Sequence, residues 1–211
     1  MRLVWECPRC PSEVTEGEAG PECGTHGPIT PLWRQRRPDF DAFGEYLLRA
    51  QDLPTWLPWP MAPGWEVTDF GCVAPEGGTP RAAFVSCAGP SDLDGVVELT
   101  VVTEEPGVGL GARAAGVPLT DPGEEVADGP PAARLRVDGA SAPVWAVSTS
   151  DAPGDLDRSV FAGEAQGRWM WLVLRPASAA LLLQHMGPLQ DVSGLGPELV
   201  ALPFGELPRS W

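Results

Sequence analysis

The sequence predicts an α+β, mainly β protein, in which a small N-terminal zinc ribbon is followed by an antiparallel β-rich domain with two or three short helices. Three observations predict this class. Short runs rich in valine and aromatic residues recur from residue 65 onward, as is typical of strands. Glycine and proline, 25 of each, separate these runs in the way that turn residues do. Potential metal ligands gather near the N-terminus, as Cys7 with Cys10 and Cys23 with His26.

Residues 1–33 form the predicted zinc ribbon, with short strands expected at residues 3–5 and 28–33. Two cysteines separated by two residues turn both thiolates toward one point, and a second pair after a hairpin-length gap completes a tetrahedron of sulfur and imidazole ligands. The four residues named above have this spacing. Because four protein ligands leave no open position for a substrate, we expect a structural Zn²⁺ rather than a catalytic one. Free cysteines or a disulfide are the alternatives.

Residues 34–64 form a predicted linker, which begins with a polar stretch at residues 34–38. Asp39 is the expected N-cap of a short helix, and the apolar residues after it repeat at helical spacing. These apolar residues are Phe40, Phe43, Leu47 and Leu48. The prolines of residues 53–60 forbid a helix and favour an extended, polyproline-like segment. We expect the two tryptophans of that segment to hold it against the main domain.

Residues 65–211 form the predicted β-rich domain. The Gly77-Gly78 turn would join the first two strands into a hairpin, in a register that sets Cys72 opposite Cys87. We expect both thiols to be reduced, and a redox-active pair is the alternative. We expect a helix at residues 177–186 that carries a buried His185, and a last strand at residues 199–202. The seven strands expected before that helix are 65–74, 81–89, 96–103, 134–138, 144–148, 158–164 and 168–175.

Three glycines alternate with other residues just before Arg113, at Gly107, Gly109 and Gly111. Glycines at this spacing expose backbone amides that can cradle an anion, and the arginine would add further donors. The spacing does not match a dinucleotide fingerprint. A wide turn at the end of a strand is the structural alternative to a ligand site.

The chain is rich in tryptophan, with nine among its 211 residues. Trp169 and Trp171 stand two apart on an expected strand, so their side chains share one face. They would form an exposed platform for a ligand or a partner, or else fill the core.

Composition excludes several chemistries and partners. All 14 basic residues are arginine, so lysine-dependent phosphate loops and Schiff bases are excluded. The net charge is −15, and residues 1–33 carry two arginines against five glutamates. This acidic character argues against nucleic acid as a partner. The apolar stretches are too short to cross a bilayer and residues 1–10 lack a signal pattern, so we expect a cytoplasmic protein without membrane association.

Taken whole, the chain resembles an uncharacterised actinobacterial family with an N-terminal zinc ribbon. The resemblance rests on Cys7-Pro8-Arg9-Cys10, on residues 56–60 with Gly64-Trp65, on residues 107–113 and on residues 160–165. It covers nearly the full length and implies a shared fold. It carries no established activity, so no functional residue can be transferred.

Two functional hypotheses follow. The first is a non-catalytic, zinc-stabilised binding or adaptor protein that recognises a protein partner or a small ligand. The alternative is a hydrolase or transferase that acts on an anionic metabolite, with the loop from Gly107 to Arg113 as the anion site and Glu104 or Glu105 as the base. The small catalytic inventory favours the first, because His185 is the one histidine outside the expected zinc site.

Overall fold

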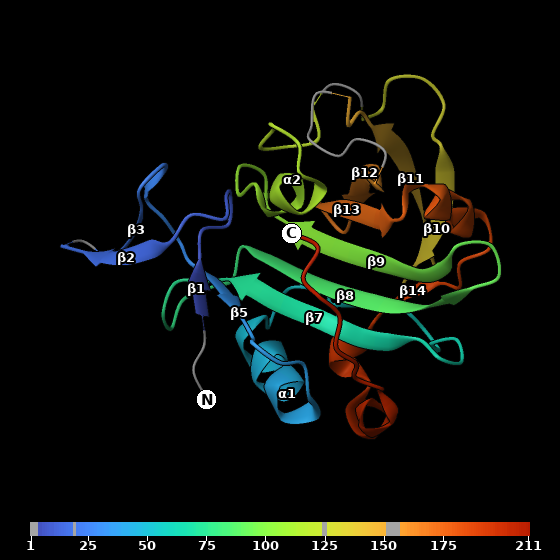
Figure 1. Cartoon of the computed structure of the whole chain (residues 1–211), viewed down its shortest axis with the longest axis horizontal. Coiled ribbons are helices and arrows are strands. Elements are labelled where there is room, and N and C mark those ends of the chain that lie inside the picture. The colour runs from blue at the N-terminus through green and yellow to red at the C-terminus, as the bar shows by residue number, and fades with distance from the viewer. Residues whose placement is uncertain (1–3, 19, 124–125, 151–156) are drawn as a thin grey trace.

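The structure of the protein is a computed structural model (Figure 1) that describes residues 4–18, 20–123, 126–150 and 157–211. Within these residues, eleven strands form one large sheet and three form a small one. The strands of the large sheet, in spatial order, are β1 (Val4–Glu6), β5 (Leu32–Arg34), β7 (Glu66–Val73), β8 (Ala82–Ser91), β9 (Gly95–Glu104), β13 (Arg168–Arg175), β12 (Ser159–Ala165), β11 (Ala140–Val147), β10 (Ala133–Val137), β14 (Leu189–Asp191) and β6 (Trp56–Pro58).

Neighbouring strands of the large sheet are antiparallel except for β10 and β14, which pair in parallel. The predicted class, mainly β with a small N-terminal unit, is confirmed. The small sheet consists of β2 (Val14–Gly17), β3 (Gly20–Cys23) and β4 (Gly27–Pro28). It is inserted between β1 and β5, which pair with each other and extend the edge of the large sheet. Of the expected strand at residues 3–5, residue 3 lies outside the described residues.

All seven strands predicted between residues 65 and 175 are confirmed. The fifth begins four residues earlier than expected, at Ala140, because a two-residue turn at Asp138-Gly139 leads directly from β10 into β11. Both turn residues have positive φ, 47° and 82°, which is the conformation of the type I′ turns that join hairpin strands.

The predicted pairing of Cys72 with Cys87 is wrong. Cys72 lies opposite Ala83, and Cys87 lies opposite Val67. The hairpin is centred on the Gly77-Gly78 turn itself, with Val73 opposite Ala82, and not on the two residues that follow it. Both thiols are buried in the sheet, each against an apolar neighbour.

Helices and loops cover both faces of the sheet. Helix α1 (Phe40–Arg49) covers one face, and α2 (Leu110–Ala115) covers the other. In Figure 1, α1 lies below β7 and α2 lies above β9. The sheet also curls, since β6 at its far edge comes back against β8. Two apolar cores result, a larger one that packs against α1 and a smaller one that packs against α2.

Helix α1 begins as predicted, with the Asp39 carboxylate accepting a hydrogen bond of 2.8 Å from the amide of Ala42. Its buried face differs from the predicted one. Phe43 is buried as expected, but Tyr46 takes the next inward position. Leu48 is 76% exposed. The buried face differs from the predicted one because α1 contacts the sheet through the rings of Phe43 and Tyr46, which pack on Phe70 of β7.

The tryptophan- and proline-rich segment forms β6 and is held against the main domain as predicted. Trp56 is 1% exposed, and its Nε1 donates to the Asp138 carboxylate at 2.8 Å. Trp59 packs against the larger core. The expected linker at residues 34–38 begins inside a strand, since Arg34 belongs to β5.

The C-terminal region contains 3₁₀ helices, the first of which lies where a helix was predicted at residues 177–186. These are η2 (Ala177–Gln184), η3 (Val192–Gly194) and η4 (Gly196–Ala201), and the last of them occupies the predicted final strand. The prediction of a buried His185 is wrong, because η2 ends before it and leaves it exposed at the rim of an apolar hollow of about 170 Å³. Among the described residues, no helix is long and apolar enough to span a membrane.

Candidate metal centre

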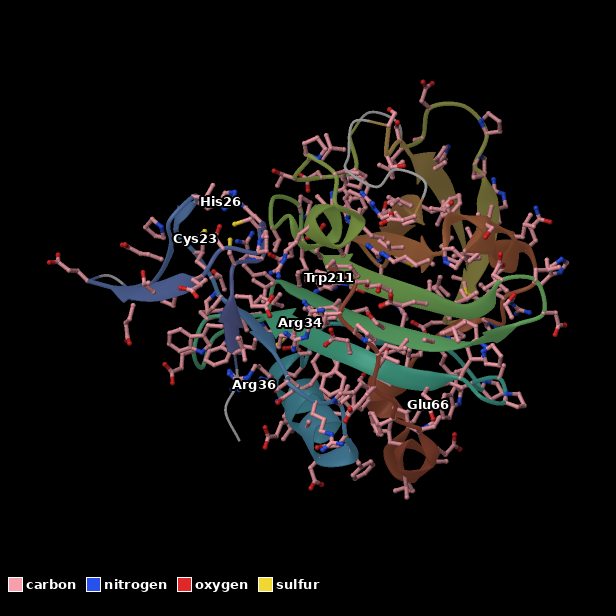
Figure 2. All side chains as sticks on the ribbon, viewed as in Figure 1. Cys23, His26, Arg34, Arg36, Glu66 and Trp211 are labelled. Atoms are coloured by element: carbon pink, nitrogen blue, oxygen red, sulfur yellow. The ribbon has the colours of Figure 1, made fainter. Side chains whose placement is uncertain are left out.

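The four predicted metal ligands come together in the small N-terminal unit. Cys7 directly follows β1, Cys23 ends β3, and His26 immediately precedes β4. Cys10 completes the set from the turn after Cys7. One ligand atom from each residue lies within 4.8 Å of all the others. Figure 2 shows Cys23 and His26 beside the edge of the large sheet.

The spacing of these atoms fits a tetrahedral metal ion. His26 Nδ1 lies 3.5 Å from Cys7 Sγ, 3.4 Å from Cys10 Sγ and 3.6 Å from Cys23 Sγ. Cys10 Sγ and Cys23 Sγ are 3.6 Å apart. For a tetrahedron with zinc bond lengths, the edges are about 3.6 Å between sulfur and nitrogen and about 3.8 Å between two sulfurs. The cluster could therefore bind a metal ion through three sulfurs and one nitrogen.

Main-chain amides surround the sulfur atoms. The amide of Arg9 donates to Cys7 Sγ at 3.4 Å. Burial opposes the thiolate form of Cys23, but hydrogen bonds from the amides of Thr25 and His26 outweigh it and lower the pKa of this thiol to about 7. Such donors stabilise thiolates and hold them in place for a metal.

Residues 7–10, which carry two of the four candidate ligands, form the metal-ligand loop. Two arginines attach this loop to the large domain. Arg9 reaches out from the loop, and donates from Nε to Val108 O at 3.1 Å and from Nη2 to Gly107 O at 2.7 Å. Arg113 reaches back from α2 and donates to the main-chain oxygen of Cys7 and to the Glu6 carboxylate. The glycine loop singled out in the sequence is thus the docking surface for the metal-ligand loop.

The amides of the glycine loop bind carboxylates of the protein itself. The Gly107 amide donates to Asp121 at 2.8 Å. The Leu110 and Gly111 amides donate to the two oxygens of Glu104, at 2.8 Å and 3.2 Å. These three amides therefore already have acceptors within the protein and are not free to bind a ligand.

Glu104 is a buried acceptor and not an exposed base. It is 0% exposed and also accepts from Trp171 Nε1 at 2.7 Å. Burial raises the pKa of Glu104 to about 7, even though these three donors favour its ionised form. Its role in the structure is to hold the start of α2 against the sheet.

The two tryptophans of β13 share a face as predicted, and that face is covered by α2. Trp171 is fully buried in the smaller core, and Trp169 packs at its edge. Gly111 lies so close to Trp171 that a Cβ there would overlap the indole ring. Trp171 therefore fills the core and presents no surface for stacking.

A buried cluster of charges lies between the metal-ligand loop and the last residues of the chain. Arg34 is 1% exposed and donates from Nε to Asp69 Oδ2 at 2.8 Å. Glu6 pairs with Arg34, Arg113 and Arg209, and although burial opposes ionisation, these arginines hold the pKa of Glu6 below its ordinary value. No local sequence pattern indicates this cluster, because its members come from positions far apart in the chain.

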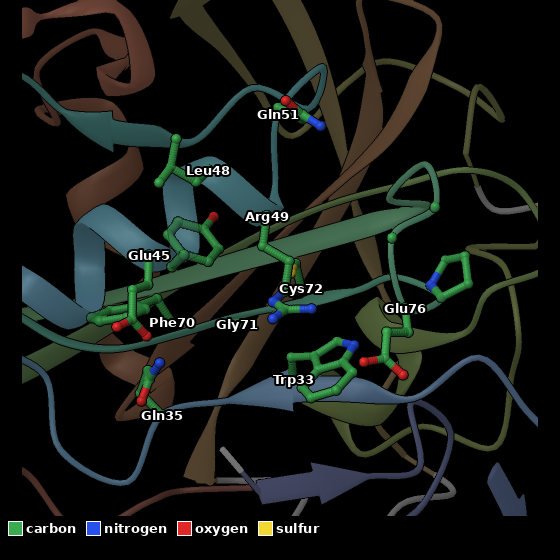
Figure 3. A pocket seen from close by; sticks show the side chains of 14 residues that line it. Trp33, Gln35, Glu45, Leu48, Arg49, Gln51, Phe70, Gly71, Cys72 and Glu76 are labelled. Atoms are coloured by element: carbon green, nitrogen blue, oxygen red, sulfur yellow. The ribbon is translucent and has the colours of Figure 1, made fainter. Parts of the chain in front are cut away.

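A hollow of about 450 Å³ opens between α1 and strands β5 and β7, the second and third strands from one edge of the large sheet. Figure 3 shows Arg49 of α1 reaching into it above Trp33 of β5. The turn between β7 and β8 closes its other side with Glu76. No feature of the sequence analysis pointed to it.

The fold and the site define a protein with a curled β-sheet and a metal-ligand loop of the Cys₃His type. The chain belongs to a family of unknown function, DUF6758, whose family model matches residues 1–210. No curated protein and no solved structure matches the chain.

Proposed function

We propose that the protein is a non-catalytic binding protein whose N-terminal unit is stabilised by a structural Zn²⁺. The observation that carries this proposal is the Cys₃His tetrahedron. Three sulfurs and one nitrogen at these separations match the ligand type and geometry that zinc prefers. A closed shell of four protein ligands leaves no coordination position for a substrate, so the ion would stabilise structure.

The metal would act on the whole fold because of where its ligands lie. The oxygen of Cys7 accepts from Arg113, and the neighbouring Glu6 joins the buried charge cluster. Ordering the loop therefore orders the groups that connect the small sheet to the large one. The cytoplasm, which keeps thiols reduced, is the compartment in which we place such a site.

The hollow beside α1 supports a binding role. Its volume of about 450 Å³ falls within the range of small-molecule pockets. Its walls carry both charged and aromatic side chains, which can orient a ligand. A small ligand is therefore favoured over a protein partner.

The hydrolase or transferase alternative has little support. It needs free amides at the glycine loop, but those of Gly107, Leu110 and Gly111 already donate to Asp121 and Glu104. It also needs Arg113, which is committed to Glu6 and Cys7.

Metal content tests the proposal. Protein purified without chelators should contain about one zinc per chain by inductively coupled plasma mass spectrometry, and cobalt should replace it with the visible spectrum of a tetrahedral thiolate site. Cys10→Ala should lose the metal, whereas the control Cys87→Ala, which removes a buried thiol of the large sheet, should keep it. Equal zinc in both variants, or a cobalt spectrum that is not tetrahedral, would overturn the metal assignment.

A further inference from the structure

The hollow between α1 and the sheet edge has a floor and two walls of different character. Its floor comes from β5 and β7, with Trp33, Phe70 and Cys72. Helix α1 supplies one wall through Glu45 and Arg49, as Figure 3 shows. The turn at residues 75–78 supplies the other.

We propose that this hollow binds a small zwitterion that carries a carboxylate and an ammonium group, the chemistry of a free amino acid. The inference rests on the proposed binding function and names the ligand class for it. Three features of the hollow carry it, namely an available guanidinium, a fixed aromatic ring beneath it, and carboxylates on either side.

Arg49 offers guanidinium donors that no other described residue accepts. Its guanidinium carbon lies 4.2 Å from the centre of the Trp33 ring. Within the described part of the chain it forms no ion pair, although Glu45 stands one helical turn before it, at a spacing where such pairs commonly form. A guanidinium held over a ring by its carbon can keep N–H donors free at its edge, and that edge matches the two oxygens of a carboxylate.

The ring beneath the guanidinium is fixed in place. Trp33 is 8% exposed, and its Nε1 donates to Ala74 O at 2.8 Å. The ring of Trp5 packs against it edge-on, with centres 5.2 Å apart. Arg49 therefore rests on a rigid support, so less side-chain freedom is lost when a ligand binds.

Two carboxylates flank the guanidinium. Figure 3 shows Glu45 and Glu76 at opposite ends of the hollow with Arg49 between them. Neither forms an ion pair with another described residue. A simple anion would meet two like charges here, and a simple cation would meet Arg49. A ligand with both charges can satisfy both kinds of group, which is how such a site would exclude singly charged molecules.

The hollow is built to bind and not to react. Its thiol, Cys72, is 1% exposed, and burial raises the pKa of this thiol to about 12. A protonated thiol is a weak nucleophile. The remaining polar side chains at the walls include the amides of Gln35 and Gln51, which can donate to or accept from a ligand of either charge.

The test titrates the full-length, zinc-loaded protein with each of the twenty free L-amino acids at millimolar concentration. Succinate and putrescine serve as probes that carry only carboxylates or only ammonium groups. We expect at least one amino acid to raise the melting temperature and to shift the indole resonance of Trp33, assigned with Trp33→Phe. Succinate and putrescine should produce neither effect at the same concentration.

Matched variants localise the binding. Arg49→Gln should weaken binding at least tenfold, whereas Arg36→Gln, which changes an exposed arginine outside the hollow, should leave it unchanged. Both variants should remain folded without ligand, although Arg49→Gln should melt at a slightly lower temperature because it loses the stack on Trp33. If no amino acid binds, if succinate or putrescine binds as well, or if Arg49→Gln binds equally, the proposal is overturned. Equal binding by Arg49→Gln would still leave the protein a binding protein, and the zinc measurement is independent of all these outcomes.

Discussion

The guanidinium of Arg34 lies 4.2 Å from the centre of the Trp211 ring and donates from Nη1 to the Trp211 main-chain oxygen at 3.1 Å. On its other side it pairs with Asp69 of β7. Figure 2 shows Arg34 and Trp211 together in front of the large sheet. One buried cation of β5 thus joins the large sheet to the last residues of the chain.

Breaking this buried pair should be costly. Arg34→Met leaves the Asp69 carboxylate without its closest partner and should lower the free energy of unfolding by about 3 kcal/mol. The double variant with Asp69→Asn should lose clearly less than the sum of the two single losses, because it leaves no uncompensated charge. Urea denaturation of the four proteins measures the coupling. Strict additivity would contradict the pairing seen here.

Two glycine-to-alanine changes should have opposite effects. Gly111→Ala places a methyl group against the indole of Trp171 and should destabilise the protein by about 1 to 3 kcal/mol. Gly44→Ala places the same group in open space on α1 and should stabilise it by about 0.5 to 1 kcal/mol. Thermal unfolding of both variants checks the difference, and a stable Gly111→Ala protein would show that α2 does not press on Trp171.

Stability should depend on the protonation of Glu104. Its pKa is about 7 in the folded protein because of burial, against about 4.3 in an unfolded chain. Between these values the folded state holds a proton that the unfolded state has released, so the free energy of unfolding falls as the pH rises.

Glu104→Gln isolates this effect. The stability of the wild type minus that of the variant should decline by about 3 kcal/mol between pH 4.5 and about pH 7. Contributions from groups such as Glu6 cancel in the difference. Urea denaturation at several pH values measures it, and a difference that grows with pH would mean that the donors lower the pKa of Glu104.

Removal of the metal should destabilise more than the N-terminal loop. The ligand loop supports Glu6, which pairs with Arg113 of α2 and with Arg34 of β5. We therefore expect a chelator to lower the melting temperature of the whole protein in one cooperative transition. Calorimetry with and without chelator measures this, and an unchanged transition would show that the large sheet folds independently of the metal.

Local patterns predicted more of this protein than long-range ones. The convergence of Cys7, Cys10, Cys23 and His26 and the cap of α1 both depend on spacings within one short segment, and both were predicted. Arg34 was taken for part of a polar linker because its partners, Asp69 and Trp211, are far away in sequence. For the glycine loop the sequence left open a ligand site and a structural turn, because spacing cannot tell that Glu104, from the preceding strand, would accept the amides of Leu110 and Gly111.

The hollow beside α1 escaped prediction for a related reason. The spacing of Glu45 and Arg49 is typical of an ordinary surface pair on a helix. The stack of Arg49 on Trp33 depends on the angle between a helix and a strand, which no local pattern encodes.

The insertion of the small sheet between two paired strands bears on how the edge of the large sheet forms. Glu6 of β1 pairs with Leu32 of β5, so the chain must close a long loop before these strands can meet, and that closure costs entropy. A metal that joins Cys7 to His26 would leave only the few residues between His26 and Leu32 to be closed. The ion would then act as a reversible crosslink, and the strand edge would form at a lower entropic cost when the metal is bound.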